Sequence, residues 1–175
     1  MRKKPLISLL LIMVIMLTGC SKTYKTKDIK YKVSDDWNCT QNKNGIFCKI
    51  VENKAAFSVF NMDTFDDEEG NGYTIDEYIE NIPKTMTGLD YEFVLNKNVK
   101  IDSHKGKNVI YYTKAKEYED DIPIINNEHI FKYNKKLYIF SFYTYDDVNA
   151  DDSDRLYQKY INDYKDIIKS IRIKK

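Results

Sequence analysis

The densest group of side chains that could do chemistry in this 175-residue chain is a run of acids between residues 63 and 69. Gly70, Asn71 and Gly72 follow this run directly, and glycines let a loop turn several oxygen atoms toward one point. Carboxylate and amide oxygens are the ligands that Ca²⁺ prefers in proteins. The segment is therefore a candidate calcium site, with ligands from Asp66, Asp67, Glu69 and Asn71.

The calcium pattern is incomplete in this segment and in a second acidic run between residues 146 and 154. The first run matches only the beginning of an EF-hand loop, because Tyr78 occupies the position that needs a bidentate Glu. The second run lacks both the required Gly and the terminal Glu. The alternative is that both runs are solvated loops, the second of them placing favourable negative charge at a helix start. We favour the solvated loops and expect no cofactor.

His104 and His129 are the only histidines and hence the natural candidates for acid–base catalysis. Neither has a nucleophile at a recognisable spacing, and the chain contains no G-x-S-x-G or H-E-x-x-H motif and no phosphate-binding glycine loop. We therefore predict that the protein is not an enzyme. The alternative is a hydrolase of the cell envelope, which requires a pocket where one of these histidines meets a carboxylate and a hydroxyl.

Cys39 and Cys48 flank the turn signal Asn44-Gly45. A two-residue turn centred there would pair Cys48 with Gln41, whereas a four-residue turn over 42–45 would place the two cysteines opposite each other. We expect the second register and a disulfide, with two free, half-buried thiols as the alternative. A metal site is not expected, because no other cysteine or nearby histidine completes a ligand set.

The N-terminus has the order of a secretory signal: Arg2, Lys3 and Lys4 precede an apolar run over 5–16. This run is too short to cross a bilayer comfortably. It leads into Leu17-Thr18-Gly19-Cys20, which resembles the lipobox of bacterial lipoproteins. The resemblance implies removal of residues 1–19 and attachment of palmitate-type acyl chains to Cys20. The alternative is an uncleaved transmembrane anchor with an incidental cysteine.

Both interpretations leave the remaining chain outside the cytoplasm, held at the cell membrane. The whole chain has a net charge of +1, and residues 1–19 hold three cations and no acid, so the remainder is at −2. A nearly neutral domain is not suited to binding nucleic acid through its electrostatic field. We expect residues 20–27 to be a solvated tether and 28–175 to be one domain.

Hydrophobic periodicity over 28–175 indicates strands, a helix, more strands and a final helix. Thr74 and Glu77 form a capping box at the start of a helix over 74–86, and Gly88 ends it. The final helix is expected to start near Ser153 and to lead into a short strand at 171–173. The other predicted strands cover 29–33, 46–51, 56–62, 91–95, 99–101, 109–114, 128–133 and 137–143.

Strands joined by hairpins, together with two separate helices, are typical of an α+β domain with a mostly antiparallel sheet. The segment 137–143 is apolar on both faces, which predicts a central strand covered on both sides. Trp37, the only tryptophan, is predicted to anchor the core.

This layout resembles the PsbP-like fold, which is shared by photosystem extrinsic proteins, a Ran-binding nuclear-transport family and many bacterial lipoproteins. The matching pieces are Tyr31-Lys32-Val33 leading to Trp37, the helix over 74–86, the turn over 105–109, the aromatic strand over 137–143 and the closing helix running into 170–173. The resemblance implies an α/β/α sandwich around an antiparallel sheet. It transfers no functional residues, because the branches of this fold do not share one site.

The resemblance further implies binding or assembly rather than catalysis. We therefore expect a membrane-anchored surface lipoprotein with a non-enzymatic binding or assembly role in the cell envelope. Its expected contacts are the membrane, through lipid on Cys20, and another envelope protein, but no nucleic acid. A ligand-binding or Ca²⁺-binding lipoprotein is an alternative beside the hydrolase.

Overall fold

The computed structural model describes residues 21–42, 45–50, 54–63, 74–85, 88–115, 124–144 and 150–174. In this part of the chain, one antiparallel sheet has the order β3-β4-β5-β9-β8-β7-β6, and a smaller one has the order β1-β2-β10. The predicted α+β class is confirmed. The elements are β1 (Ser21–Lys25), β2 (Ile29–Ser34), β3 (Asn38–Asn42), β4 (Gly45–Lys49), β5 (Ala55–Asp63), α2 (Ile75–Thr85), β6 (Leu89–Ile101), β7 (His104–Ala115), β8 (Ile124–Tyr133), β9 (Lys136–Thr144), α3 (Ala150–Ser170) and β10 (Arg172–Ile173).

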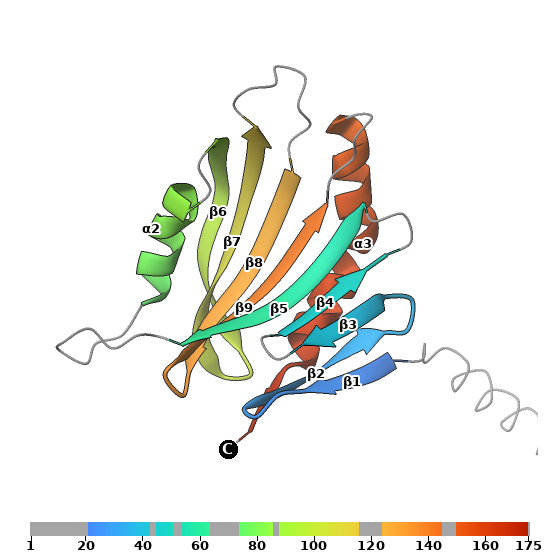
Figure 1. Ribbon diagram of the computed structural model, residues 1–175, viewed down its shortest axis with the longest axis vertical. Helices are drawn as coiled ribbons and strands as arrows, with labels where there is room; N and C mark the ends of the chain where they lie inside the picture. Colours follow the sequence, from blue (N-terminus) through green and yellow to red (C-terminus); the bar gives the residue numbers. More distant parts are fainter. Residues whose placement is uncertain are drawn as a thin grey trace, which may run out of the picture.

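The two helices lie on opposite faces of the large sheet, giving the predicted α/β/α sandwich (Figure 1). Ile79 and Ile82 of α2 pack on one face against Ile139 of β9. Tyr164 of α3 packs on the other face against Phe140, the next residue of β9. The small sheet belongs to the α3 side, because its inward side chains share the core of that side. Neither of the described helices has the length and apolar character needed to span a lipid bilayer.

Strand β9 is the middle strand of the large sheet, and its residues 137–142 are all buried. This confirms the prediction of a central strand with cover on both faces. On the α3 side, Trp37 is 2% exposed, and its ring lies 6.3 Å from that of Phe142 and 6.2 Å from that of Tyr160. Trp37 is thus the core anchor that the sequence predicts.

The predicted capping box fixes the start of α2. The Thr74 backbone N–H donates to Glu77 Oε2 over 2.7 Å, and the Glu77 N–H donates to Thr74 Oγ1 over 3.1 Å. These bonds satisfy two donors that a helix start leaves without intrahelical partners. Lys107 of β7 also forms a salt bridge of 3.1 Å with Asp76 in the first turn. The capping box therefore defines where α2 begins, and the Lys107–Asp76 salt bridge links its first turn to the sheet.

Residues 21–25, expected to belong to a solvated tether, form strand β1 instead. This strand pairs with β2 from Ser21 opposite Ser34 to Lys25 opposite Lys30. The ring of Tyr24 stacks on that of Tyr31, with 6.0 Å between their centroids. The other side chains of β1 are exposed, so the segment lacks the alternating hydrophobic pattern that indicates a strand.

Other boundaries also differ from the prediction. The segments predicted at 91–95 and 99–101 belong to one strand, β6. Residues 96–98 between them pair with β7 but are polar and exposed, so they show no hydrophobic pattern, and a β-bulge between Phe93 and Leu95 further disturbs the alternation. Strand β8 begins at Ile124 rather than at Glu128. The prediction missed its first residues because polar side chains occupy buried positions there and interrupt the hydrophobic pattern. Helix α3 begins three residues before Ser153.

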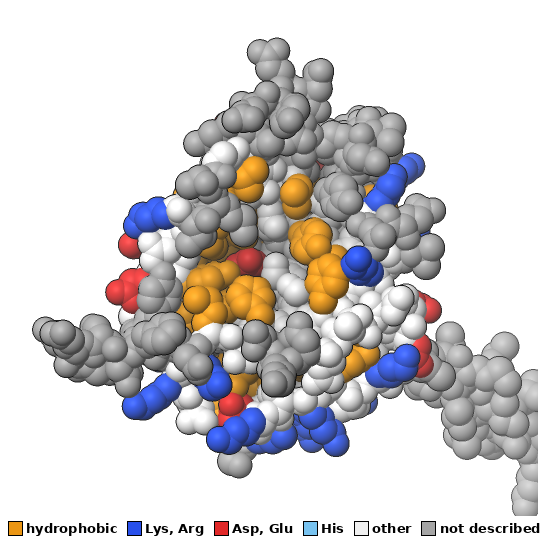
Figure 2. All heavy atoms as spheres, viewed as in Figure 1, with side chains coloured by type: hydrophobic (Ala, Val, Ile, Leu, Met, Phe, Trp, Pro, Cys, Tyr) orange, Lys and Arg blue, Asp and Glu red, His pale blue; other side chains and the backbone are white. Residues whose placement is uncertain are grey.

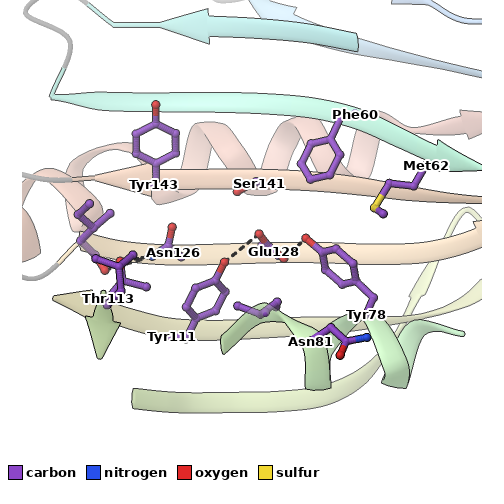
Figure 3. A pocket seen from close by; sticks show the side chains of 13 residues that line it. Phe60, Met62, Tyr78, Asn81, Tyr111, Thr113, Asn126, Glu128, Ser141 and Tyr143 are labelled. Carbon is purple, nitrogen blue, oxygen red and sulfur yellow. Dashed lines mark hydrogen bonds between the residues drawn. The ribbon is translucent and has the colours of Figure 1, made fainter. Parts of the chain in front are cut away.

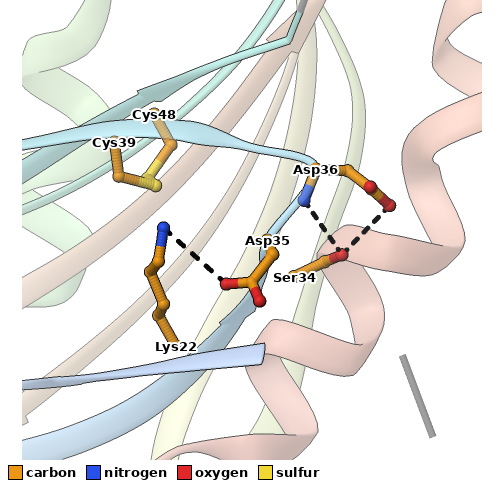
Figure 4. Close-up of a disulfide and its surroundings, with 6 residues drawn as sticks. All are labelled: Lys22, Ser34, Asp35, Asp36, Cys39 and Cys48. Carbon is orange, nitrogen blue, oxygen red and sulfur yellow. Dashed lines mark hydrogen bonds and ion pairs between the residues drawn. A yellow bond between two sulfur atoms is a disulfide. The ribbon is translucent and has the colours of Figure 1, made fainter. Parts of the chain in front are cut away.

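Cys39 and Cys48 lie opposite each other on β3 and β4 and form a disulfide (Figure 4). This is the register that a turn over 42–45 produces. Gly45 opens β4, where a Cβ atom would overlap the backbone carbonyl oxygen of Val59. The glycine therefore allows β4 to lie close against β5.

Candidate binding pocket

Helix α2 covers only part of its face of the large sheet and leaves a cavity of about 370 Å³ beside it. Figure 2 shows this hollow, with hydrophobic side chains around it. Its walls come from α2 and from strands β5 to β9, so it is built by regular elements. The lining residues are Phe60, Met62, Tyr78, Asn81, Ile82, Leu89, Tyr111, Thr113, Ile124, Asn126, Glu128, Ser141 and Tyr143.

A buried carboxyl group, that of Glu128 on β8, lies on the sheet side of this cavity (Figure 3). Glu128 is only 4% exposed. The Tyr111 hydroxyl, from β7, donates to Glu128 Oε1 over 3.0 Å. The Tyr78 hydroxyl, from α2, donates to Glu128 Oε2 over 3.2 Å. The two tyrosines thus approach the carboxyl from a strand and from the covering helix, one at each oxygen.

Burial raises the pKa of Glu128 from 4.5 to about 7, because the ionised form loses its hydration. Hydrogen bonds from Tyr111, Tyr78 and Ser141 favour the ionised form and limit this rise. Burial, together with the nearby Glu128 charge, also holds the pKa of Tyr111 well above its ordinary value. Near neutral pH the cavity therefore contains one carboxyl group that can be either protonated or ionised, beside neutral hydroxyls.

This arrangement is suited to binding. An apolar cavity with a few convergent polar groups is the common form of a small-ligand site, and the observed volume lies in the usual range of such sites. Two of the lining residues also bond to each other, because Asn126 Nδ2 donates to Thr113 Oγ1 over 3.2 Å. The polar groups can orient an incoming group, and the aromatic and aliphatic walls can bury it.

The two histidines lie away from this cavity. His129 follows Glu128 in β8, so its side chain points to the opposite face of the sheet. Its Nδ1 atom lies 2.9 Å from the Tyr164 hydroxyl, and burial lowers its pKa to about 4. His104 begins β7 just after the hairpin turn, with Nδ1 3.0 Å from the Asp102 carbonyl oxygen. In the described part of the chain, neither histidine lines the pocket that the hydrolase alternative requires.

His129 belongs to a buried polar network on the α3 side. The Tyr164 hydroxyl donates to the Phe140 carbonyl oxygen over 2.7 Å, so the His129 Nδ1 atom must be the donor to Tyr164. Asn127 Nδ2 donates to the Tyr157 hydroxyl over 2.7 Å, and Asn108 Nδ2 donates to Asn127 Oδ1 over 2.6 Å. These bonds tie α3 to β7 and β8, which gives His129 a structural role.

Several predicted site residues lie outside the described residues: Cys20, Asp66, Asp67, Glu69 and Asn71. Within the described ranges, no group of three or more His, Cys, Asp or Glu residues is placed to hold a metal ion.

Sequence reasoning did not single out Glu128 as a site residue. Its signal is the run Asn126-Asn127-Glu128-His129, four polar residues between two isoleucines on one side and Ile130 and Phe131 on the other. Polar residues inside an apolar strand must find buried partners. Such a run therefore indicates a buried polar site, although only the fold reveals that Tyr78 and Tyr111 are the partners.

No protein-family model matches this chain, and no curated protein matches it. Among solved structures, the cyanobacterial PsbP (CyanoP) of Synechocystis sp. PCC 6803 aligns over 91% of this chain and 99% of its own, with a TM-score of 0.63 and 10% identity. The fold is PsbP-like. The same PsbP-like arrangement occurs in the Ran-binding protein Mog1p of Saccharomyces cerevisiae, which aligns over 89% of this chain and 96% of its own, with a TM-score of 0.61 and 7% identity.

A further PsbP-like neighbour is PA94 of Pseudomonas aeruginosa, a protein of unknown function. It aligns over 87% of this chain and 96% of its own, with a TM-score of 0.53 and 12% identity. Similarities at such low identity establish the shared fold alone.

Proposed function

We propose that this chain is a lipid-anchored, extracytoplasmic binding domain without catalytic activity. It holds another component of the cell envelope by accepting an apolar group of that component in the cavity beside α2. The observation that carries this proposal is the open apolar cavity with the Tyr78–Glu128–Tyr111 group on its sheet side. A protein with this fold can have a binding role, since Mog1p is a Ran-binding protein.

The pairing of polar groups in the cavity supports binding over catalysis. The two tyrosine hydroxyls donate to the Glu128 carboxyl, and neither is held by a histidine base, as an activated hydroxyl nucleophile would be. Both histidines have structural neighbours elsewhere, His129 at Tyr164 and His104 against the ring of Tyr133. A domain that binds without reacting requires only the shape and polarity of this cavity.

The membrane anchor rests on the lipobox resemblance of Leu17-Thr18-Gly19-Cys20. It is tested by growing cells with a clickable palmitate analogue and comparing the chain with its Cys20→Ser variant. We expect the chain to be labelled and the variant to remain unlabelled, with residues 1–19 retained. Equal labelling of both proteins would reject Cys20 as the lipidation site.

The binding role is tested by photo-cross-linking in intact cells. p-Benzoylphenylalanine is placed at Tyr143, which lines the cavity, and separately at Gln158, an exposed residue of α3, as the matched control. We expect a recurrent adduct from position 143 alone, identified by mass spectrometry as a protein or a small molecule. No adduct from position 143, or the same adducts from both positions, would contradict a binding role for this cavity.

A further inference from the structure

We infer that the apolar group which the envelope component places in the cavity carries an organic ammonium, whose cationic nitrogen pairs with the Glu128 carboxylate. This inference rests on the proposed binding function and adds the chemical class of the ligand.

The first argument is the charge inside the cavity. Among the described residues, its lining contains one acidic residue and no Lys, Arg or His. A buried carboxylate that lacks a cationic partner is costly, and a cation supplied by a ligand removes much of that cost. Glu128 is therefore complementary to an ammonium and repels an anionic ligand.

Among the described residues, the groups that face Glu128 do not supply this cation. Tyr78 approaches it from α2 and Tyr111 from β7, and both only donate hydrogen bonds. Ser141 of β9 also hydrogen-bonds to the carboxyl, and Tyr164 of α3 interacts with it electrostatically from the other face. All four contribute a hydroxyl group, and a hydroxyl group cannot supply a cation.

The second argument is the hydrogen-bonding capacity of the carboxylate. The hydroxyls of Tyr78, Tyr111 and Ser141 use three of the roughly four acceptor sites of the carboxylate, which leaves about one. An ammonium can donate one of its N–H bonds to this remaining site without displacing Tyr78, Tyr111 or Ser141. The existing bonds would then hold the carboxylate in place for the ligand.

The third argument is the character of the walls. Phe60 and Tyr143 add two aromatic rings to the lining, and Met62, Ile124 and Leu89 add aliphatic surface. Aromatic faces attract cations, and aliphatic surface buries an apolar body. The ligand is therefore small and amphiphilic, with its ammonium toward β8 and its apolar body along the walls.

Ionic pairing makes the affinity depend on pH. Glu128 has a pKa of about 7, and the ammonium binds only the ionised carboxylate, so binding below pH 7 must release a proton. The affinity for an amine should then fall roughly tenfold for each pH unit below 7, whereas that for a neutral analogue should not.

The inference is tested with two probes of nearly equal shape, 2-phenylethylamine and 2-phenylethanol. Their binding to the mature lipidated chain in nanodiscs is measured by calorimetry between pH 5.5 and 8, with empty nanodiscs as the blank. We expect the amine to bind at least tenfold more tightly than the alcohol at pH 8, and its affinity to fall with decreasing pH. Glu128→Gln should remove both the preference and the pH dependence.

Equal binding of both probes, unchanged in the Glu128→Gln variant, would overturn the inference and leave the cavity as an apolar binding site. Failure of both probes to bind would also overturn it, and the cross-linking from position 143 then decides separately whether the proposed function stands. The comparison of probes and of pH values uses the unaltered chain, so the result does not depend on the folding of a variant.

Discussion

Replacing Glu128 by Gln should change how the stability of the fold depends on pH. The folded-state pKa of Glu128 is raised from 4.5 to about 7, so between these values the folded chain keeps a proton that the unfolded chain has released. A carboxyl group whose pKa is raised in the folded state therefore lowers the free energy of unfolding as pH rises through this interval. The shift corresponds to about 3 kcal/mol at about 1.4 kcal/mol per pH unit.

The assay is urea unfolding of the chain and of the Glu128→Gln variant at intervals between pH 4 and 8. The informative quantity is the difference between their free energies of unfolding. Other groups titrate in this range, such as His129, whose lowered pKa reduces stability as pH falls, but they are common to both proteins and cancel. Between pH 4.5 and 7 we expect the free energy of unfolding of the variant to rise relative to that of the unaltered chain, by up to about 3 kcal/mol.

The matched control is Glu92→Gln, at an exposed position of β6. It measures the effect of a Glu-to-Gln change at a solvated position, and the curve for Glu128→Gln is compared with it. A flat curve for Glu128→Gln would refute the reasoning, because it would mean that burial does not hold the Glu128 proton in the folded state. An altered hydrogen bond to a tyrosine would shift the whole curve without giving it a slope.

Three further substitutions test other parts of the fold by chemical unfolding. The double variant Cys39→Ser/Cys48→Ser should lose about 2–3 kcal/mol of its free energy of unfolding, because the unfolded chain gains conformational freedom when the disulfide no longer closes a loop. Reduction should cause the same loss in the unaltered chain and none in the variant. An unchanged stability would contradict this prediction. Thr74→Ala should lose about 1 kcal/mol with its cap, whereas Thr74→Ser should lose much less; equal losses would refute the capping role. Gly45→Ala should cost about 1–3 kcal/mol, because the new Cβ must push β4 away from Val59, and a neutral effect would show that the strands separate freely.

Local signals in the sequence were sufficient for the elements whose determinants lie close together in the chain. The capping box at Thr74 needs residues only three apart, and it formed as predicted. The strand over 137–143 is recognisable because five of its six consecutive buried side chains are apolar or aromatic. Trp37 is predictable as a core residue because burial of a large aromatic side chain next to a strand removes much apolar surface from water.

The candidate site could not be predicted in the same way, because its parts come from distant segments. Tyr78 and Glu128 are 50 residues apart, and Tyr111 and Glu128 are 17 apart. The polar run around Glu128 also interrupts the hydrophobic pattern. For this reason the predicted strand begins at Glu128, whereas β8 begins at Ile124. The position of a buried polar residue follows from the packing of whole elements, which periodicity does not report.

Strand β1 has a consequence for how copies of this protein behave beside one another. It is an outer strand of the small sheet, and among the described strands its hydrogen-bonded neighbour is β2. An outer strand can pair with a second copy and begin aggregation, and lysines on such a strand oppose this. Lys25 already lies opposite Lys30, so a second copy of β1 paired along this edge would bring more lysines close together, and their positive charges would repel. The lysines of this segment therefore favour separate domains even where many copies are crowded together.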